Sequence, residues 1–475
     1  MTWSLLPDIS PLRESAGFRA MFTSRTVAFL GSQAGEVAIL VQAQRLTGSP
    51  LVVGTLGLAE LVPLIVFGLY GGVLADRFDR RKLMVWCEPG LAACAGLLLV
   101  NSLLPHPPLW PLYVVAALMM GIASLQRPAF EAATPRVVPL EKLTQASAVM
   151  SLSTNASVLL GSSLGGALAA APGPWLVYAL NVAGYVVSFA MLRRLPALPP
   201  ITPGADGASD GSSGPDGSSG SDGSDGDGPA SRAPALSEIL VGLRYAISRR
   251  DLLGSYLADL SAMIFAYPNA MLPFLALELH APWSTGLLFA APSAGALIVS
   301  ATGGWMPRIR RHGLAIAVAA GSWGLAMAAV GVSPTLYVAL FFLAVAGGAD
   351  ECSAIFRDTM WKQSIPDHLR GRMAGIELLS YAAGPPTGQL RSGAVAAVTS
   401  PRFSLTSGGL ACVAAVAAVL AVLPAFRGYV APVGAPATAS PAGQPALPGA
   451  LRIQDRGDGF ELHELVGVSE HGDAD

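Results

Sequence analysis

Charged and amide side chains occur inside several apolar stretches of this 475-residue chain. Inserting one ionisable group into a membrane helix costs about 2.5–3.5 kcal/mol, so each such residue is a candidate for function. Glu36 lies in an apolar run, with Gln33 three residues before it on the same face of a helix. The other candidates within apolar runs are Arg127, Glu131, Asp259, Asp350 and Glu351.

A carboxylate in the middle of a membrane could carry a proton or neutralise a cationic substrate. The rise of an α-helix places Glu36 about 16 Å beyond Arg25, near the midplane of a bilayer. Arg127 and Glu131 are four residues apart and can pair on one helix. For the acids nearer to basic helix ends, a structural ion pair between helices is the alternative; they are Glu88, Glu131, Asp350, Glu351 and Glu377.

The composition indicates a chain whose outer surface faces lipid. Hydrophobic residues make up 52% of the chain and charged residues 13%, whereas soluble domains carry about 25% charged residues. A net charge of −2 does not indicate the excess of basic residues that is typical of nucleic-acid-binding proteins. Twelve apolar runs are long enough to span a bilayer: 22–43, 51–75, 83–104, 110–133, 146–171, 174–192, 252–277, 283–306, 313–333, 335–356, 373–398 and 404–426.

The distribution of Lys and Arg predicts the orientation. With twelve spans, all the basic residues outside Arg127 fall on one face except Arg45, Arg391 and Arg402. Because cytoplasmic loops carry the excess of basic residues, both termini are expected in the cytoplasm of a cell whose inner or plasma membrane holds the chain.

The chain is expected to divide into two helix bundles joined by a flexible linker. The run at 201–234 is rich in Gly, Ser and Asp and should be disordered, and 237–250 should form an amphipathic helix. The predicted parts are a cytoplasmic segment (1–21), a six-helix bundle (22–193), a cytoplasmic linker (194–251), a second six-helix bundle (252–426) and a disordered tail (427–475).

The two predicted bundles share features at separations of 223–232 residues, which indicates a duplicated six-helix unit. Six helices are an even number, so both copies enter the membrane in the same sense, as in transporters built from parallel repeats. The matched features are Gly71-Gly72 with Gly303-Gly304, Val138-Pro139 with Ile365-Pro366, and the helix-packing glycines Gly161 and Gly165 with Gly384, Pro385 and Gly388.

The loop after the second run has a recognisable pattern. It begins at Gly72 and continues through Asp76-Arg77 to the basic pair Arg80-Arg81. This pattern resembles the signature loop of the major facilitator superfamily, although Asp79 stands where that family usually has Gly. The resemblance implies a twelve-helix, all-α membrane protein in which this loop latches the two bundles on the cytoplasmic side. The alternative is a basic loop that only sets topology.

Finer details resemble the branch that contains enterobactin-type siderophore exporters and drug-efflux proteins. These are RTVAFLGSQAGEVAILVQAQRLTGS, VGTLGLAELVPL and ATPRVVPLEKLTQASA. The resemblance implies that the first, fourth, seventh and tenth helices line a central cavity. Glu60, Glu88 and Glu377 are expected outside that set. The Gly161–Gly166 segment lacks the proline of antiporter helix 5, and the helix-4 Arg-x-x-Gln-Gly element is absent.

We therefore expect a secondary active transporter, a proton-coupled exporter of a small amphiphilic molecule that works by alternating access as a monomer in the bilayer. An importer or facilitator of a small metabolite is the alternative. From a different functional class, the alternative is a membrane-embedded enzyme or a receptor. Gly161-Ser-Ser-Leu-Gly165 matches a hydrolase nucleophile motif, but that motif requires a strand before it. No cofactor and no metal site are expected.

Overall fold

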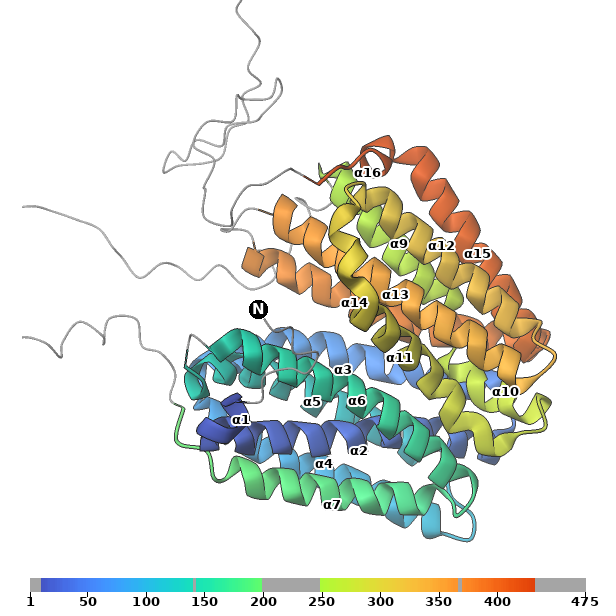
Figure 1. Cartoon of the computed structure of the whole chain (residues 1–475). Coiled ribbons are helices and arrows are strands. Elements are labelled where there is room, and N and C mark those ends of the chain that lie inside the picture. Colours follow the sequence, from blue (N-terminus) through green and yellow to red (C-terminus); the bar gives the residue numbers. More distant parts are fainter. Residues whose placement is uncertain (1–9, 140–141, 199–247, 366–369, 432–475) are drawn as a thin grey trace, which may run out of the picture. The chain divides into compact units, whose positions relative to one another are not determined.

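The computed structural model describes residues 10–139, 142–198, 248–365 and 370–431, without the side chains of 69–77, 144, 307 and 370–382. Within these residues all regular structure is helical, which confirms the predicted all-α class. The first half holds α1 Ser10–Glu14, α2 Ala16–Thr47, α3 Pro50–Arg77, α4 Arg80–Leu103, α5 Trp110–Val137, α6 Leu143–Ala170 and α7 Pro174–Leu192 (Figure 1).

The second half follows the same plan with more interruptions. Its elements are α9 Arg250–Ala266, η2 Asn269–Met271, α10 Leu272–Glu278, η3 Pro282–Ser284, α11 Thr285–Thr302, η4 Gly303–Arg308, α12 His312–Gly331, α13 Leu336–Ser364, α14 Arg370–Val398, α15 Pro401–Val422 and α16 Pro424–Arg427. The predicted linker run, the predicted amphipathic helix up to 247 and the tail beyond 431 lie outside the described residues.

Local sequence signals set the ends of these helices. The Ser15 hydroxyl accepts a hydrogen bond from the backbone N–H of Phe18 and begins α2. Gly48 ends α2 in the left-handed region, at φ 59°, which glycine adopts without strain. Asp79, where the signature pattern usually has Gly, accepts from the backbone N–H groups of Arg81 and Lys82 and begins α4.

Helical segments occur at all twelve predicted spans, and ten of them are long and apolar enough to cross a membrane by composition. The two others are α6 and α14, with 28 and 29 residues. Each packs against a helix of the opposite half, α6 against α11 and α14 against α3.

Three predicted spans differ from the structure in ways that bear on the site. The run 252–277 is broken after α9, because Pro268 has no backbone N–H to continue the helix. Helix α2 begins at Ala16 and α13 continues to Ser364, both beyond the predicted runs, so Arg25 lies away from the end of its helix and Arg357 lies inside a helix. The sequence had counted both arginines with the cytoplasmic face, because apolar runs locate the lipid-facing stretch of a helix and not its ends.

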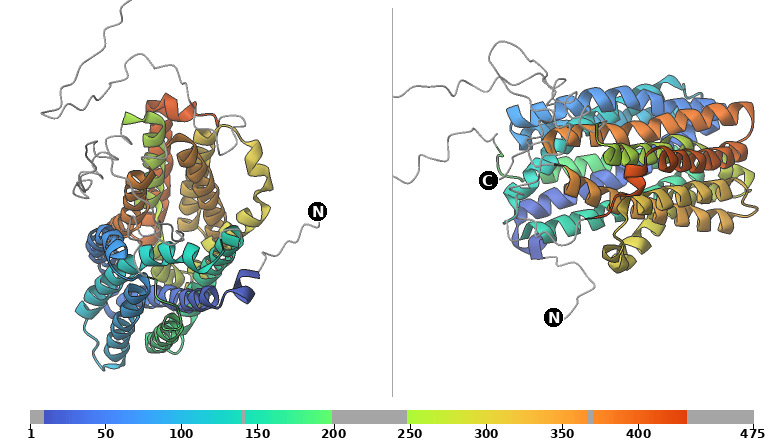
Figure 2. Two further views of the ribbon diagram at one scale, coloured as in Figure 1. Left: turned by 90° about the vertical axis from the view of Figure 1, so that its left-hand side faces the viewer. Right: turned by 90° about the horizontal axis from the view of Figure 1, so that it is seen from above.

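The two halves meet mainly through two helix pairs, and most other extensive helix contacts lie within one half. Helix α2 packs on α6 and α7, and α12 packs on α13 and α15. Figure 2 shows α3 in blue beside α14 in orange, one of the two main contacts that join the halves. The outer surface is apolar; side chains more than half exposed include Leu97, Val100, Val186 and Phe341. Such a surface fits a lipid environment.

Glycines permit the contacts between halves, and they lie at one end of the helices. A Cβ atom on Gly166 would come within 2.2 Å of the Gly286 Cα, so α6 and α11 touch through their backbones. A Cβ on Gly54 would lie 2.5 Å from the Gln389 carbonyl oxygen, at the α3–α14 contact. Gly54 follows the α2–α3 turn and Gly286 begins α11, so both contacts lie toward the ends farther from the signature loop.

Candidate functional site

A cavity of about 590 Å³ lies between the two halves and is lined by both. Most of its wall comes from α2, α3, α4 and α5, and the second half contributes Tyr267, Pro385, Pro386 and Gln389. Apolar side chains such as Phe29, Leu64, Met119 and Met120 alternate with acids and amides. The volume is that of a site for a drug-sized molecule.

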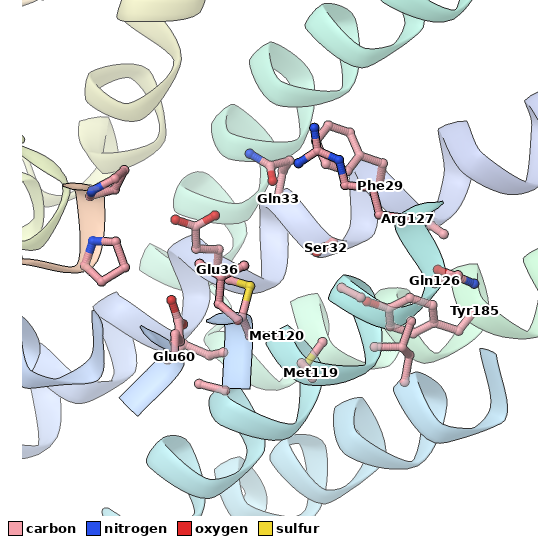
Figure 3. Close-up of a pocket in the computed structure, with 18 of the residues that line it drawn as sticks. Phe29, Ser32, Gln33, Glu36, Glu60, Met119, Met120, Gln126, Arg127 and Tyr185 are labelled. Atoms are coloured by element: carbon pink, nitrogen blue, oxygen red, sulfur yellow. The ribbon is translucent and has the colours of Figure 1, made fainter. Parts of the chain in front are cut away.

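Two carboxylates share one side of this cavity. Glu36 from α2 and Glu60 from α3 both line it and interact electrostatically with each other. Figure 3 shows the two side chains close together, with Met119 and Met120 between them and Tyr185. The side-chain amide of Asn269 forms a hydrogen bond with the Glu36 carboxylate and donates to the Tyr267 hydroxyl oxygen, 2.9 Å away.

Glu36 also faces a second, smaller cavity of about 240 Å³. This cavity shares Gln33, Glu36 and Tyr267 with the larger one and extends to Asp350 on α13. The structure therefore brings together Glu36, Gln33 and Asp350, three of the residues that the sequence singled out. Glu36 lies in the wall between two spaces, where a change in its charge affects both.

A third acid lies at the wall of the larger cavity. Glu88 is fully buried, and its Oε1 accepts a hydrogen bond of 2.7 Å from the Gln126 side-chain amide. The same amide nitrogen donates to the Met84 carbonyl oxygen at 3.3 Å. The Glu88 Oε2 is buried without a hydrogen-bond partner among the described residues. A carboxylate buried so deeply is costly to keep in its charged form.

The cavity continues toward the end of the helices that carries the signature loop. Arg25 and Phe130 line both the 590 Å³ cavity and a neighbouring, larger one of about 680 Å³. There Arg127 and Glu131 form the predicted ion pair at 3.1 Å, with side chains 51% and 63% exposed. Glu351 from the second half lines the same space and accepts from the Ser300 hydroxyl at 2.7 Å. The halves are thus joined at one end and separated at the other.

Asp259 lies apart from these cavities. Its side chain is 2% exposed and forms an ion pair with Arg357 of α13, whose guanidinium lies 5.6 Å from the centre of the Trp361 ring. Asp350, two turns before Arg357 on the same helix, interacts electrostatically with both members of the pair. The sequence placed Asp259 in a cavity-lining helix but gave no sign of its partner, because Arg357 was assigned to a loop.

The residues of the signature loop are described only in part. Gly72, Asp76 and Arg77 lie in the last turns of α3, and their side chains are outside the described part. Arg80 donates to the Ala132 carbonyl oxygen at 3.2 Å, and Arg81 donates to that of Arg193 at 2.7 Å. These contacts hold the loop to α5 and α7. The latch between halves stays a prediction.

The helix-packing glycines lie at close helix contacts. A Cβ on Gly161 would be 2.5 Å from the Leu30 carbonyl oxygen, and one on Gly165 would be 2.5 Å from Ala34, both on α2. A Cβ on Gly384 would be 2.6 Å from the Met263 Cβ on α9, and one on Gly388 would be 2.1 Å from the Met263 carbonyl oxygen. Pro385 lines the 590 Å³ cavity. Ser163, in the hydrolase-like motif, donates to the Leu159 carbonyl oxygen within α6, so the motif is part of a helix.

Sequence reasoning missed several cavity residues. Glu60 and Glu88 were expected outside the cavity, and Gln126 and Tyr185 were not singled out, yet all four line it. Their positions in apolar runs were visible in the sequence. Which helix face meets the cavity depends on the tilt and rotation of α3, α4 and α7, which hydrophobic periodicity does not specify for helices that are apolar all round.

Sequence comparison finds related membrane proteins over most of this chain. Residues 7–200 match the transmembrane secretion effector family. The enterobactin exporter EntS of Citrobacter koseri is 29% identical over 420 residues, which cover 86% of this chain and 92% of that relative. The enterobactin exporter EntS of Shigella boydii is 29% identical over 440 residues, covering 90% and 96%.

Solved structures show the same fold at low sequence identity. The nucleoside transporter NupG aligns with a TM-score of 0.64 and 10% identity, over 86% of this chain and 98% of NupG. A POT family transporter in complex with 5-aminolevulinic acid aligns with a TM-score of 0.67 and 9% identity, over 89% and 99%. The chain has the fold of these transporters, and most of its length is similar in sequence to membrane exporters. It is a multi-span membrane protein that carries a small molecule, and it is not an enzyme.

Proposed function

We propose that this transporter exports a small amphiphilic molecule of the siderophore type from the cytoplasm across the inner membrane and that proton entry drives the export. The observation that carries the proposal is the pair of carboxylates, Glu36 and Glu60, on one wall of a cavity between the two halves. The named activity of the relatives, which match over most of this chain, supports the direction and the substrate class.

The electrostatics of the pair support proton coupling. Two carboxylates that face one membrane cavity repel each other, so ionising both is costly unless a cation lies between them. The most readily available cation is a proton held by one of the two. A substrate that donates hydrogen bonds to the same oxygens would displace this proton, and that competition couples the two movements in opposite directions.

The cavity walls support an amphiphilic substrate. The Met and Phe side chains provide adaptable apolar contacts. The carboxylates and amides accept hydrogen bonds from hydroxyl or ammonium groups at a few positions. A molecule with aromatic rings and phenolic hydroxyl groups, as in catechol siderophores, matches both properties.

Alternating access follows from the separation of the halves at one end. With both termini in the cytoplasm, the separated end faces the cytoplasm, where substrate enters. Closure of this end and opening at the glycine contacts of α6–α11 and α3–α14 would release substrate outside. Protonation of Glu36 or Glu60 would favour one of these two states, because a ligand shifts a conformational equilibrium only through differential affinity.

Everted membrane vesicles that contain the full chain test this function. We expect enterobactin to accumulate in the lumen when the lumen is acidified, and the accumulation to collapse when a protonophore is added. Vesicles from cells without the chain provide the control. Accumulation only in right-side-out vesicles would make the protein an importer, and accumulation unaffected by the protonophore would remove the proton from the mechanism.

A further inference from the structure

A separate apolar groove lies on the second half, between α12, α13 and η4. Its volume is about 440 Å³, and it shares no lining residue with the three cavities described above. The described lining residues are Trp305, Ile309, Arg311, Leu314, Ala315, Val318, Ala319, Ser322, Ala349, Cys352 and Phe356. None of them is acidic, and the transport cycle proposed above uses none of them.

Small residues on two helix faces create this groove. Ala315, Ala319 and Ser322 lie one turn apart along α12, and Ala349 and Cys352 follow the facing side of α13. Where larger side chains would interdigitate, these leave a hollow between the helices. One end is closed by aromatic rings, since the ring centroids of Trp305 and Phe356 are 6.5 Å apart. An empty apolar hollow loses dispersion contacts, so a long apolar chain would bind there favourably.

Positive charge surrounds the entrance of the groove. Arg311 contributes to the groove wall, and Arg308 and Arg310 precede it on the same short connection between η4 and α12. All three side chains are exposed. The groove surface also faces outward, because Val318 in its wall is 59% exposed and Trp305 is 40% exposed. Guanidinium groups bind phosphate oxygens through paired hydrogen bonds.

We propose that this groove is a binding site for an anionic phospholipid. One acyl chain lies along the small residues of α12 and α13, and Arg308 and Arg311 bind the phosphate of the headgroup. Basic pockets between membrane helices bind anionic headgroups in this way. The site depends neither on the direction of transport nor on the transported molecule, because it lies apart from the transport cavity.

Native mass spectrometry of the purified full chain tests this proposal. The protein is mixed with equal amounts of phosphatidylglycerol and phosphatidylcholine of the same chain length, and the retained lipids are counted. We expect one phosphatidylglycerol to be retained in preference to phosphatidylcholine. Joint replacement Arg308→Gln and Arg311→Gln should lower that preference about tenfold or more. The matched control is Arg193→Gln with Arg194→Gln, a pair of exposed arginines at the end of α7.

A second variant tests the acyl-chain part without changing any charge. Ala315→Leu fills the groove and should reduce retention of both lipids, while its melting temperature in lipid-free detergent stays near that of the parent protein. Equal retention of the two lipids by the parent chain would overturn the headgroup assignment. Unchanged retention in Ala315→Leu would overturn the groove as the site, whatever the transport assays give.

Discussion

Acidic residues in the membrane part of this protein occupy two different environments. Glu36 and Glu60 face a cavity that water or substrate can enter, whereas Asp259 is buried and paired with Arg357. A carboxylate that faces the cavity can gain or lose a proton during a transport cycle with little loss of protein stability. A buried ion pair is disrupted only with a large loss of stability, because one charge is left without compensation. We therefore assign Glu36 and Glu60 to transport and Asp259 to the architecture of the second half.

The first prediction concerns Asp259. Asp259→Asn should destabilise the protein by about 3–5 kcal/mol, since it leaves the Arg357 guanidinium buried without its carboxylate. Adding Arg357→Leu should recover much of the loss. The measurement is thermal unfolding in detergent. Asp358→Asn is the matched control on the same helix, because its pair with Lys362, at 2.7 Å, is exposed and worth less than about 1 kcal/mol. Equal melting temperatures for both variants would contradict the assignment.

Helices α6 and α14 join the two halves, α6 through its contact with α11 and α14 through its contact with α3. Both contain glycines whose neighbours are backbone atoms of the opposite half, as at Gly166 with Gly286 and Gly393 with Pro50. Backbone contact of this kind is found where helices approach closely. It is also easily separated, because no long side chains have to disengage. We infer that these contacts form the gate that opens at this end.

The second prediction tests this gate. Gly286→Ala places a Cβ 2.2 Å from the Ser163 carbonyl oxygen, so α6 and α11 cannot approach as they do here. We expect the distance between spin labels on α6 and α11 to increase and transport to slow at least several-fold. Gly321→Ala on α12 is the control, since a Cβ there meets no atom within 4 Å. If Gly286→Ala left both the distance and the transport rate unchanged, the contact would not be a gate.

The sequence predicts where along the chain the helices form, but it does not predict which helices contact one another. Apolar runs predicted the twelve helical segments because membrane helices must be apolar over about 20 residues. The start of α2 at Ala16 and the end of α13 at Ser364 were missed, and so was the break at Pro268. For the site, the depth of Glu36 followed from counting residues, but the approach of Glu60 and the pairing of Asp259 with Arg357 depend on helix rotation.

The molecule as a whole consists of two halves that meet mainly through two helix pairs, α3 with α14 and α6 with α11. Such an arrangement suits relative motion, and the linker between the halves must allow it. Residues 206–228 of this linker lie outside the described residues, and their composition, rich in Gly, Ser and Asp, is typical of sequences that connect domains without fixing their geometry. We infer that this run acts only as a connection.

The third prediction concerns the length of that connection. Replacing residues 206–228 with a flexible Gly/Ser stretch half as long should leave the transport rate within about twofold of the parent chain, because the end-to-end distance of a flexible linker changes slowly with its length. Transport in vesicles is compared at equal membrane abundance. Loss of transport at normal abundance would show that the aspartates of this run have a function of their own.

Glu36→Gln tests the central claim of proton-driven export most directly. Gln keeps the size and hydrogen bonding of the side chain but cannot exchange a proton. In everted vesicles with an acidified lumen, this variant should no longer accumulate enterobactin, while enterobactin binding and downhill exchange persist. Glu14→Gln, an exposed acid outside the cavities that pairs with Lys142, should accumulate it normally. Uphill accumulation by Glu36→Gln at the parent rate between pH 6 and 8 would contradict the account.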